Sequence, residues 1–98
     1  MRVEFSSFVE SDLDSIADYI AQDNPTRAVT FLQEIQAQIH GVGRNPLIYQ
    51  LRPEIGEGAR MAIVGRYAIL FRMVGDIVRI ERVVYGGRDL LALFQPEE

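Results

Sequence analysis

Alternating and helical patterns divide the first quarter of the chain into a short strand and a helix. Val3 and Phe5 alternate with polar neighbours, which predicts a first strand. Ser11 and Asp14 then resemble a capping box with aspartate in the glutamate position, so we expect a helix over residues 12–22. The apolar residues of this helix recur every three or four positions and are Leu13, Ile16, Ala17 and Ile20.

A second helix is predicted directly after the first. Asn24 is suited to cap free backbone amides, and Pro25 fits the first helical position because it has no amide hydrogen to leave unpaired. We expect this helix to end at Gly41 and Gly43. Its apolar stripe consists of Ala28, Leu32, Ile35, Ile39 and Val42. The two helices are therefore predicted to form an antiparallel hairpin.

The second half of the chain has the pattern of a three-stranded meander. Residues 44–58 mix prolines and glycines with scattered apolar residues, which is typical of a loop. Gly65-Arg66 and Gly75-Asp76 are two-residue loops with glycine first, the type II′ pattern that joins antiparallel strands. The three predicted strands are residues 59–64, 67–74 and 77–85.

Period-two alternation gives the last predicted strand two different faces. Val78, Ile80 and Val84 share one face, which we expect to pack on the core. The other face is mixed, and its apolar members are candidates for contact with a partner. That second face comprises Ile77, Arg79, Glu81, Val83 and Tyr85.

These elements predict an α+β domain spanning residues 1–98, with the order β-α-α-β-β-β. Packing the helical hairpin on one face of a small antiparallel sheet buries the apolar side of both layers. The first strand is expected to join this sheet beside a later strand. A short C-terminal helical turn, or docking of the tail against a sheet edge, is expected from Leu90, Leu91, Leu93 and Phe94.

Composition narrows the class of protein. The 98 residues are 48% hydrophobic and 24% charged, as in a globular domain. Cysteine is absent, which excludes disulfides and thiolate chemistry. The sequence has no run of about 20 apolar residues, and it begins with a strand pattern rather than a leader, so we expect a cytoplasmic protein without a membrane segment.

Charge is distributed unevenly along the chain. The net charge of −4 argues against a general nucleic-acid binder. We also expect no direct sequence-specific nucleic-acid binding by the chain alone. The C-terminal part is nevertheless basic through Arg60, Arg66, Arg72, Arg79, Arg82 and Arg88. These arginines either share a surface for an anionic ligand or lay their stems on apolar neighbours. Asp12, Asp14 and Asp18 lack the spacing of a calcium loop, so we interpret them as a solvated acidic face and expect no metal or cofactor.

A set of short motifs in a fixed order gives the chain a family resemblance. They are Asp12-Leu13 through Tyr19-Ile20, Asn24-Pro25 with Ala28, Arg52-Pro53-Glu54, Gly58-Ala59-Arg60, Gly65-Arg66-Tyr67 and Gly87-Arg88-Asp89. Together they resemble ParE toxins of the RelE/ParE toxin-antitoxin superfamily along nearly the whole chain. The resemblance implies a helical hairpin on a small sheet, neutralisation by a cognate ParD-like antitoxin, and inhibition of DNA gyrase.

The alternative within the same superfamily is a ribosome-dependent mRNA endoribonuclease of the RelE type. RNA cleavage requires proton-transfer groups beside cations. This sequence offers few of them, because it has no lysine and its one histidine, His40, lies near the end of the second predicted helix. Tyr85 stands where many relatives carry histidine, which puts a proton-transfer role at that position in doubt.

Candidate binding residues follow from the end of the last predicted strand. Tyr85 and Arg88 lie where a sheet can present side chains to a partner, although Arg88 could instead pair with Asp89 and fix the tail. Our candidates for contact with the target are Arg60, Arg66, Tyr85, Arg88 and Asp89. Our candidates for contact with the antitoxin are Leu90, Leu91, Leu93 and Phe94, which could equally close the core. No catalytic residue is assigned.

Overall fold

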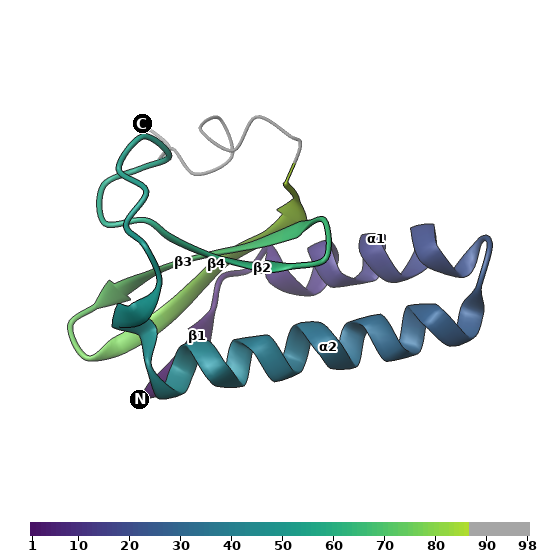
Figure 1. Cartoon of the computed structure of the whole chain (residues 1–98), viewed down its shortest axis with the longest axis horizontal. Coiled ribbons are helices and arrows are strands. Elements are labelled where there is room, and N and C mark those ends of the chain that lie inside the picture. The colour runs from purple at the N-terminus through teal and green to yellow at the C-terminus, as the bar shows by residue number, and fades with distance from the viewer. Residues whose placement is uncertain (87–98) are drawn as a thin grey trace.

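Two helices cover one face of a four-stranded sheet in the computed structural model, which describes residues 1–86 (Figure 1). The elements in chain order are β1 (Arg2–Phe5), α1 (Val9–Ala21), α2 (Pro25–Arg44), the 3-10 turn η1 (Pro46–Ile48), β2 (Arg60–Val64), β3 (Tyr67–Val74) and β4 (Ile77–Tyr85). The predicted order and the helical hairpin are confirmed. The predicted C-terminal turn lies outside the described residues.

The sheet has the order β1-β4-β3-β2 and is mixed rather than wholly antiparallel. β2, β3 and β4 form the predicted meander. Its two turns carry Gly65 and Gly75 at φ +57° and +63°, a region that glycine enters without steric cost. β1 lies beside β4 but parallel to it, because the chain returns through both helices before the meander begins.

The main core lies between the sheet and the helices. Phe71, Ile80 and Val78 from the sheet are fully buried against Ile35 and Val42 of α2. A smaller cluster lies on the opposite face of the sheet, where the segment between η1 and β2 covers it. That cluster consists of Ile55, Ala59, Ala68, Leu70 and Val84. The loop predicted for residues 44–58 therefore covers a second apolar cluster, to which it contributes Ile55.

A β-bulge in β4 corrects the predicted alternation of that strand. Leu70 pairs with Arg82 and Phe71 pairs with Ile80, so Glu81 has no residue opposite it on β3. Beyond the bulge the faces exchange. Val83 packs in the core beneath the helices, whereas Val84 packs in the cluster on the other face. The sequence-based assignment of these two valines was wrong for this reason.

Both helices differ from the prediction at one end. α1 begins at Val9, and its N-cap residue Phe8 makes no side-chain cap, so the expected capping box at Ser11 does not form. The Ser6 hydroxyl instead accepts from the Phe8 amide at 3.2 Å and donates to the Glu81 carbonyl at 2.6 Å. This hydroxyl joins the start of α1 to the bulge.

The second helix starts as predicted and ends later. The Asn24 side chain accepts a hydrogen bond from the Arg27 amide at 3.1 Å, so the expected cap is confirmed. α2 continues through Gly41 and Gly43 to Arg44. A Cβ at Gly43 would lie 2.8 Å from Cγ2 of Val3. Glycine at position 43 therefore serves close packing of α2 on β1 rather than helix termination.

Two glycine substitutions in α2 are expected to change stability in opposite directions. Gly43→Ala should lower the free energy of unfolding by about 1–3 kcal/mol, because its methyl group overlaps Val3. Gly41→Ala should raise it by about 0.5–1 kcal/mol, because the nearest atom, the Tyr49 hydroxyl, lies at an ordinary contact distance of 3.6 Å. Urea unfolding of both variants measures the difference, and equal effects would contradict it.

Candidate functional site

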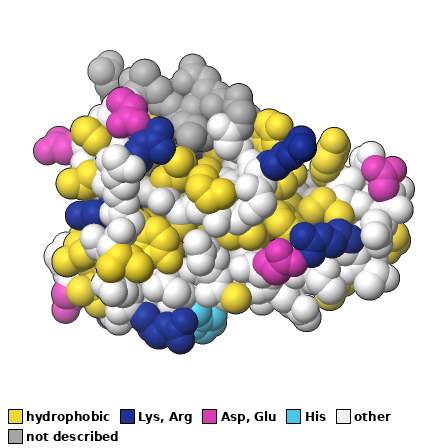
Figure 2. Space-filling view, in the orientation of Figure 1, with side chains coloured by type: hydrophobic (Ala, Val, Ile, Leu, Met, Phe, Trp, Pro, Cys, Tyr) yellow, Lys and Arg dark blue, Asp and Glu magenta, His cyan; other side chains and the backbone are white. Residues whose placement is uncertain are grey.

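The arginines of the C-terminal half do not form one shared patch within residues 1–86. Arg72 and Arg79 both pair with Glu81, and Arg82 pairs with Asp12 of α1. The Arg60 guanidinium donates to the Tyr49 carbonyl. On the face drawn in Figure 2, the arginine side chains likewise lie apart from one another. Most of these charges are thus used in local contacts.

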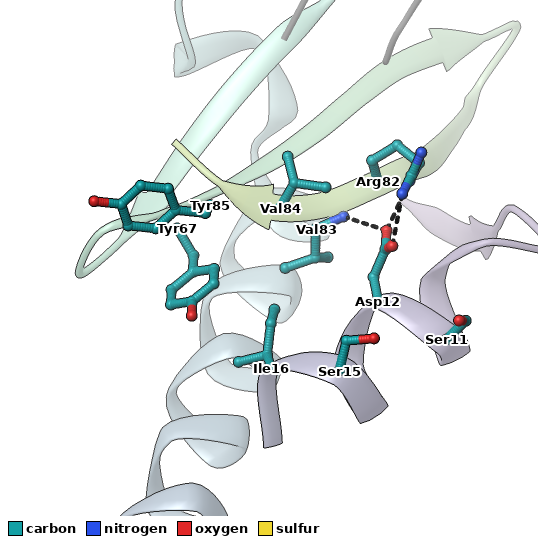
Figure 3. A pocket seen from close by; sticks show the side chains of 9 residues that line it. All are labelled: Ser11, Asp12, Ser15, Ile16, Tyr67, Arg82, Val83, Val84 and Tyr85. Carbon is teal, nitrogen blue, oxygen red and sulfur yellow. Dashed lines mark hydrogen bonds and ion pairs between the residues drawn. The ribbon is translucent and has the colours of Figure 1, made fainter. Parts of the chain in front are cut away.

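Asp12 connects α1 to the bulged part of β4 (Figure 3). Its carboxylate accepts two hydrogen bonds from the Arg82 guanidinium, both at 2.8 Å, and one from the Val83 amide at 3.0 Å. Only 10% of the Asp12 side chain and 18% of the Arg82 side chain are exposed. The hydrogen bond that Arg82 donates to the Asp12 carboxylate raises the pKa of Arg82. Arg82 also lies over the Phe8 ring, with its guanidinium carbon 4.9 Å from the ring centre.

This contact corrects the interpretation of the acidic residues of α1. Asp14 and Asp18 are exposed, in agreement with a solvated acidic face. Asp12 is instead part of the interface between α1 and β4. The described residues contain no cluster of acidic or histidine side chains that could hold a metal ion. His40 is exposed on α2, as a solvated helix-end residue should be.

A pocket of about 340 Å³ lies beside this ion pair, between α1 and the end of β4. We call it the edge pocket. Figure 3 shows Ser11, Asp12, Ser15 and Ile16 on the helix below the strand end. The lining residues are Ser11, Asp12, Ser15, Ile16, Tyr67, Arg82, Val83, Val84 and Tyr85. Hydroxyl groups and the paired charges make its walls largely polar.

A second pocket, of about 600 Å³, adjoins the first and is mainly aromatic. We call it the aromatic pocket. Its lining residues are Tyr19, Ile20, Arg27, Phe31, Arg66, Tyr67 and Tyr85. Tyr67 and Tyr85 line both pockets, so the two form one continuous groove. The groove runs along one side of α1, from Ser11 to Tyr19.

The aromatic rings in this pocket contact one another. The Tyr67 ring centre lies 5.5 Å from that of Phe31 and 5.8 Å from that of Tyr85. Arg27 lies over the Phe31 ring at 5.0 Å and pairs with Glu34. Arg66 is exposed at the β2–β3 turn and makes no ion pair with any residue up to Gly86. Within residues 1–86, Arg66 is thus a guanidinium without an ion pair that borders an aromatic surface.

Burial raises the pKa of the Tyr67 hydroxyl above 10.0, and the nearby Tyr19 and Tyr85 add to the effect. The unfolded chain thus loses this proton at lower pH than the folded chain, so stability should fall as pH rises past about 10. Tyr67→Phe should lose less free energy of unfolding than the wild type between about pH 9 and about pH 11. Urea unfolding across this range measures the two slopes, and parallel curves would contradict the expectation.

The aromatic half of the groove offers binding groups rather than proton-transfer groups near neutral pH. A phenol titrates near pH 10, and an arginine guanidinium keeps its proton throughout the working range of proteins. Aromatic rings and arginine are, by contrast, the side chains that dominate protein-binding surfaces. The groove is therefore suited to contact with another macromolecule.

The structure brings together only part of the predicted site. Arg66 and Tyr85 meet in the aromatic pocket, whereas Arg60 is held by the Tyr49 carbonyl, away from that pocket. Arg88, Asp89 and the predicted antitoxin contacts lie outside the described residues. Sequence reasoning missed Tyr19 and Tyr67. The contact of Tyr67 with Tyr85 had no local signal, because a regular β3–β4 hairpin would pair Tyr67 with Val84 and the bulge at Glu81 shifts it opposite Tyr85.

Comparisons with known proteins agree with this fold. The family described as the ParE toxin of the type II toxin-antitoxin system parDE matches residues 3–90. A solved structure of the chromosomal ParDE system from P. aeruginosa is similar at 24% identity and a TM-score of 0.75. The match covers 87% of this chain and 95% of that one. No curated protein matches the chain.

The family match spans nearly the whole described chain and includes every element of the sheet and both helices. The structural likeness, at its low identity, supports the fold alone. No helix within residues 1–86 is both long and apolar enough to cross a membrane. From the family match, we conclude that the chain belongs to the ParE toxin family of type II toxin-antitoxin systems.

Proposed function

We propose that the chain inhibits DNA gyrase by protein contact, without chemistry of its own, and that a ParD-like antitoxin holds it inactive in the cytoplasm. The observation that supports contact over catalysis is the composition of the groove. Its aromatic half is made of phenols, Phe31, Ile20 and guanidiniums, and none of these groups exchanges protons readily near neutral pH.

Arg66 and Tyr85 are the described residues that we assign to the target contact. Both border the aromatic pocket and both are exposed, Arg66 in the β2–β3 turn and Tyr85 at the end of β4. Arg88 and Asp89 follow Tyr85 after Gly86 and Gly87 in the sequence, so we keep them in the same proposed surface. Arg60 belongs to the same set of candidates, but its guanidinium already donates to the Tyr49 carbonyl. The proposed target contact therefore depends mainly on the other residues.

The antitoxin contact is proposed for the tail. Leu90, Leu91, Leu93 and Phe94 form an apolar run after the last strand, and such a run favours contact with an amphipathic partner. The remaining basic character of the C-terminal half is mostly neutralised within residues 1–86. This supports a protein target over direct nucleic-acid binding by the chain alone.

The test uses the purified chain against two targets. We expect it to impair supercoiling by gyrase, or to trap gyrase on cleaved DNA, and to leave messages intact in a translation extract. Cleaved messages with unaffected gyrase would instead identify a ribosome-dependent endoribonuclease. Unimpaired growth of cells that express the chain without an antitoxin would identify a domain that has lost toxicity.

A further inference from the structure

β2 forms one edge of the sheet, and only the beginning of its outer side is covered. The sheet order β1-β4-β3-β2 gives β2 a neighbouring strand on one side only. Leu51 forms an isolated bridge with Arg60, and the Arg52 amide donates to the Ala59 carbonyl at 2.7 Å. This bridge closes the first part of the edge. Beyond it, residues 61–64 have no strand on their outer side within the described part of the chain.

Two hydrogen bonds show which backbone groups of β2 point outward. The Arg52 contact places the Ala59 carbonyl on the outer side. The Ile63 carbonyl lies on the same side, because it accepts from the Gln38 side chain at 3.3 Å. Backbone groups alternate along a strand, so odd-numbered residues of β2 face outward and even-numbered residues bond to β3. Both backbone groups of Met61 and the Ile63 amide therefore face outward, and none of the three has a hydrogen-bond partner within residues 1–86.

The open part of this edge is apolar and carries no charge. Ile63 is 52% exposed, and it lies beside Ala68 on the sheet face that is turned away from the helices. Edge strands are usually protected by charged side chains or proline, and residues 61–64 contain neither. β1, at the other edge of the sheet, contains Arg2 and Glu4. β2 is thus the edge that can accept a further strand without bringing a charged residue of its own into the contact.

We infer that a second copy of this chain pairs with residues 61–64 as an antiparallel strand, across a two-fold axis at Ile63. In this register the Ile63 amide of each copy donates to the Ile63 carbonyl of the other, as in a hydrogen-bonded antiparallel pair. The two isoleucine side chains then lie opposite each other on one face, and such apolar cross-strand pairs stabilise a sheet. The register also keeps the incoming strand clear of Leu51, which covers the edge at Arg60.

Symmetry and neutrality favour a second copy as the occupant. A two-fold contact is self-complementary, and it uses the open edge of both copies, so the assembly closes as a dimer. The net charge of −4 on each copy opposes pairing only from a distance, because residues 61–64 are uncharged and salt screens the remainder. Residues 61–64 line neither pocket of the groove, so this contact is separate from the proposed function and does not depend on it.

The dimer is expected to be weak and reversible. Gln38 must release the Ile63 carbonyl before the two strands can pair. The open edge is also short, whereas stable protein complexes bury about 1,200–2,000 Å² in total. Pairing should therefore depend on the concentration of the chain, with monomer and dimer in equilibrium.

Analytical ultracentrifugation of the full-length chain alone tests the pairing. We expect the average mass to rise from monomer toward dimer between about 10 μM and about 1 mM. Ile63→Lys should weaken dimerisation at least tenfold, because two lysines then meet at the axis. Val29→Lys is the matched control, because Val29 is 58% exposed on α2, and it should change dimerisation less than twofold. A monomer throughout this range, or equal effects of the two lysines, overturns the inference.

Disulfide cross-linking tests the register. The chain has no cysteine, so Ile63→Cys carries one thiol per copy. Residues that face each other in a hydrogen-bonded antiparallel pair have Cα atoms about 5.5 Å apart, a separation that a disulfide can span. With oxidised glutathione as the oxidant, Ile63→Cys should form a covalent dimer at least tenfold faster than Val29→Cys, and thermal unfolding confirms that both variants fold. Equal rates overturn the two-fold pairing at Ile63.

Amide hydrogen exchange distinguishes the other possible occupants of the edge. Exchange of the Ile63 amide should slow as the concentration of the chain alone rises. Protection that is already complete in the dilute chain and independent of concentration would indicate that its own tail covers the edge. Protection that appears only when an antitoxin or gyrase is added would indicate that partner instead. Each of these two outcomes overturns the inference.

Discussion

Asp12→Ala is expected to lower the free energy of unfolding by about 3–5 kcal/mol, the typical effect of removing one partner of a buried ion pair. The Asp12 carboxylate accepts three hydrogen bonds, two from Arg82 and one from the Val83 amide. Its removal leaves the Arg82 charge in a site where only 18% of that side chain is exposed. It also leaves the Val83 amide without its partner. Urea unfolding followed by circular dichroism measures the loss.

Asp14→Ala is the matched control. Asp14 lies two residues away on the same helix and is exposed, so its substitution should change stability by less than about 0.5 kcal/mol. The double variant Asp12→Leu with Arg82→Met should recover a large part of the loss, because neither charge is then left buried and unpaired. A loss in Asp12→Ala no greater than that in Asp14→Ala would contradict the role assigned to this ion pair.

The arrangement of elements could be predicted because it is encoded by local patterns. Two helical stripes, the cap at Asn24, and glycine at the first position of each hairpin turn fixed the order and most bounds of the elements. Each of these features acts within a few residues. The parallel pairing of β1 with β4 was not predicted, because neither strand's own alternation specifies the direction of its neighbour.

Features that depend on distant residues could not be predicted. The bulge at Glu81 adds one residue to a strand whose apolar pattern looks regular, so the exchange of Val83 and Val84 between faces has no local signal. Asp12 resembles its acidic neighbours in the sequence, and only its partner 70 residues away distinguishes it. The start of α1 was placed late because Ser6, rather than Ser11, makes the hydroxyl contacts at that end.

Only the part of the candidate site that depends on local patterns could be predicted from the sequence. Arg66 lies in the β2–β3 turn and Tyr85 ends β4, and both positions follow from local turn and strand patterns. Tyr19 and Phe31 complete the aromatic pocket from the helices, and their position depends on how the hairpin packs on the sheet. Arg60 seemed equivalent to Arg66 in the sequence, but the Tyr49 carbonyl binds its guanidinium.

Arg66→Glu is expected to weaken inhibition of gyrase by at least about tenfold, which corresponds to about 1.4 kcal/mol of binding free energy. Arg66 is the exposed guanidinium beside the aromatic pocket, and reversing its charge places a carboxylate where the proposed target surface should be acidic. The fold should be unaffected, because the Arg66 contact to Gly86 uses its backbone carbonyl. The measurement is the toxin concentration that halves supercoiling activity.

Arg44→Glu provides the matched charge reversal away from the groove. Arg44 is exposed at the end of α2 and lines neither pocket, so its substitution changes the net charge equally without touching the proposed surface. The difference between the two variants should shrink at high salt, because ions screen exposed charges. Tyr85→Ala should weaken inhibition at both salt concentrations, because its ring contributes apolar contact. If Arg66→Glu inhibits gyrase as well as Arg44→Glu does, the target contact lies elsewhere on the chain.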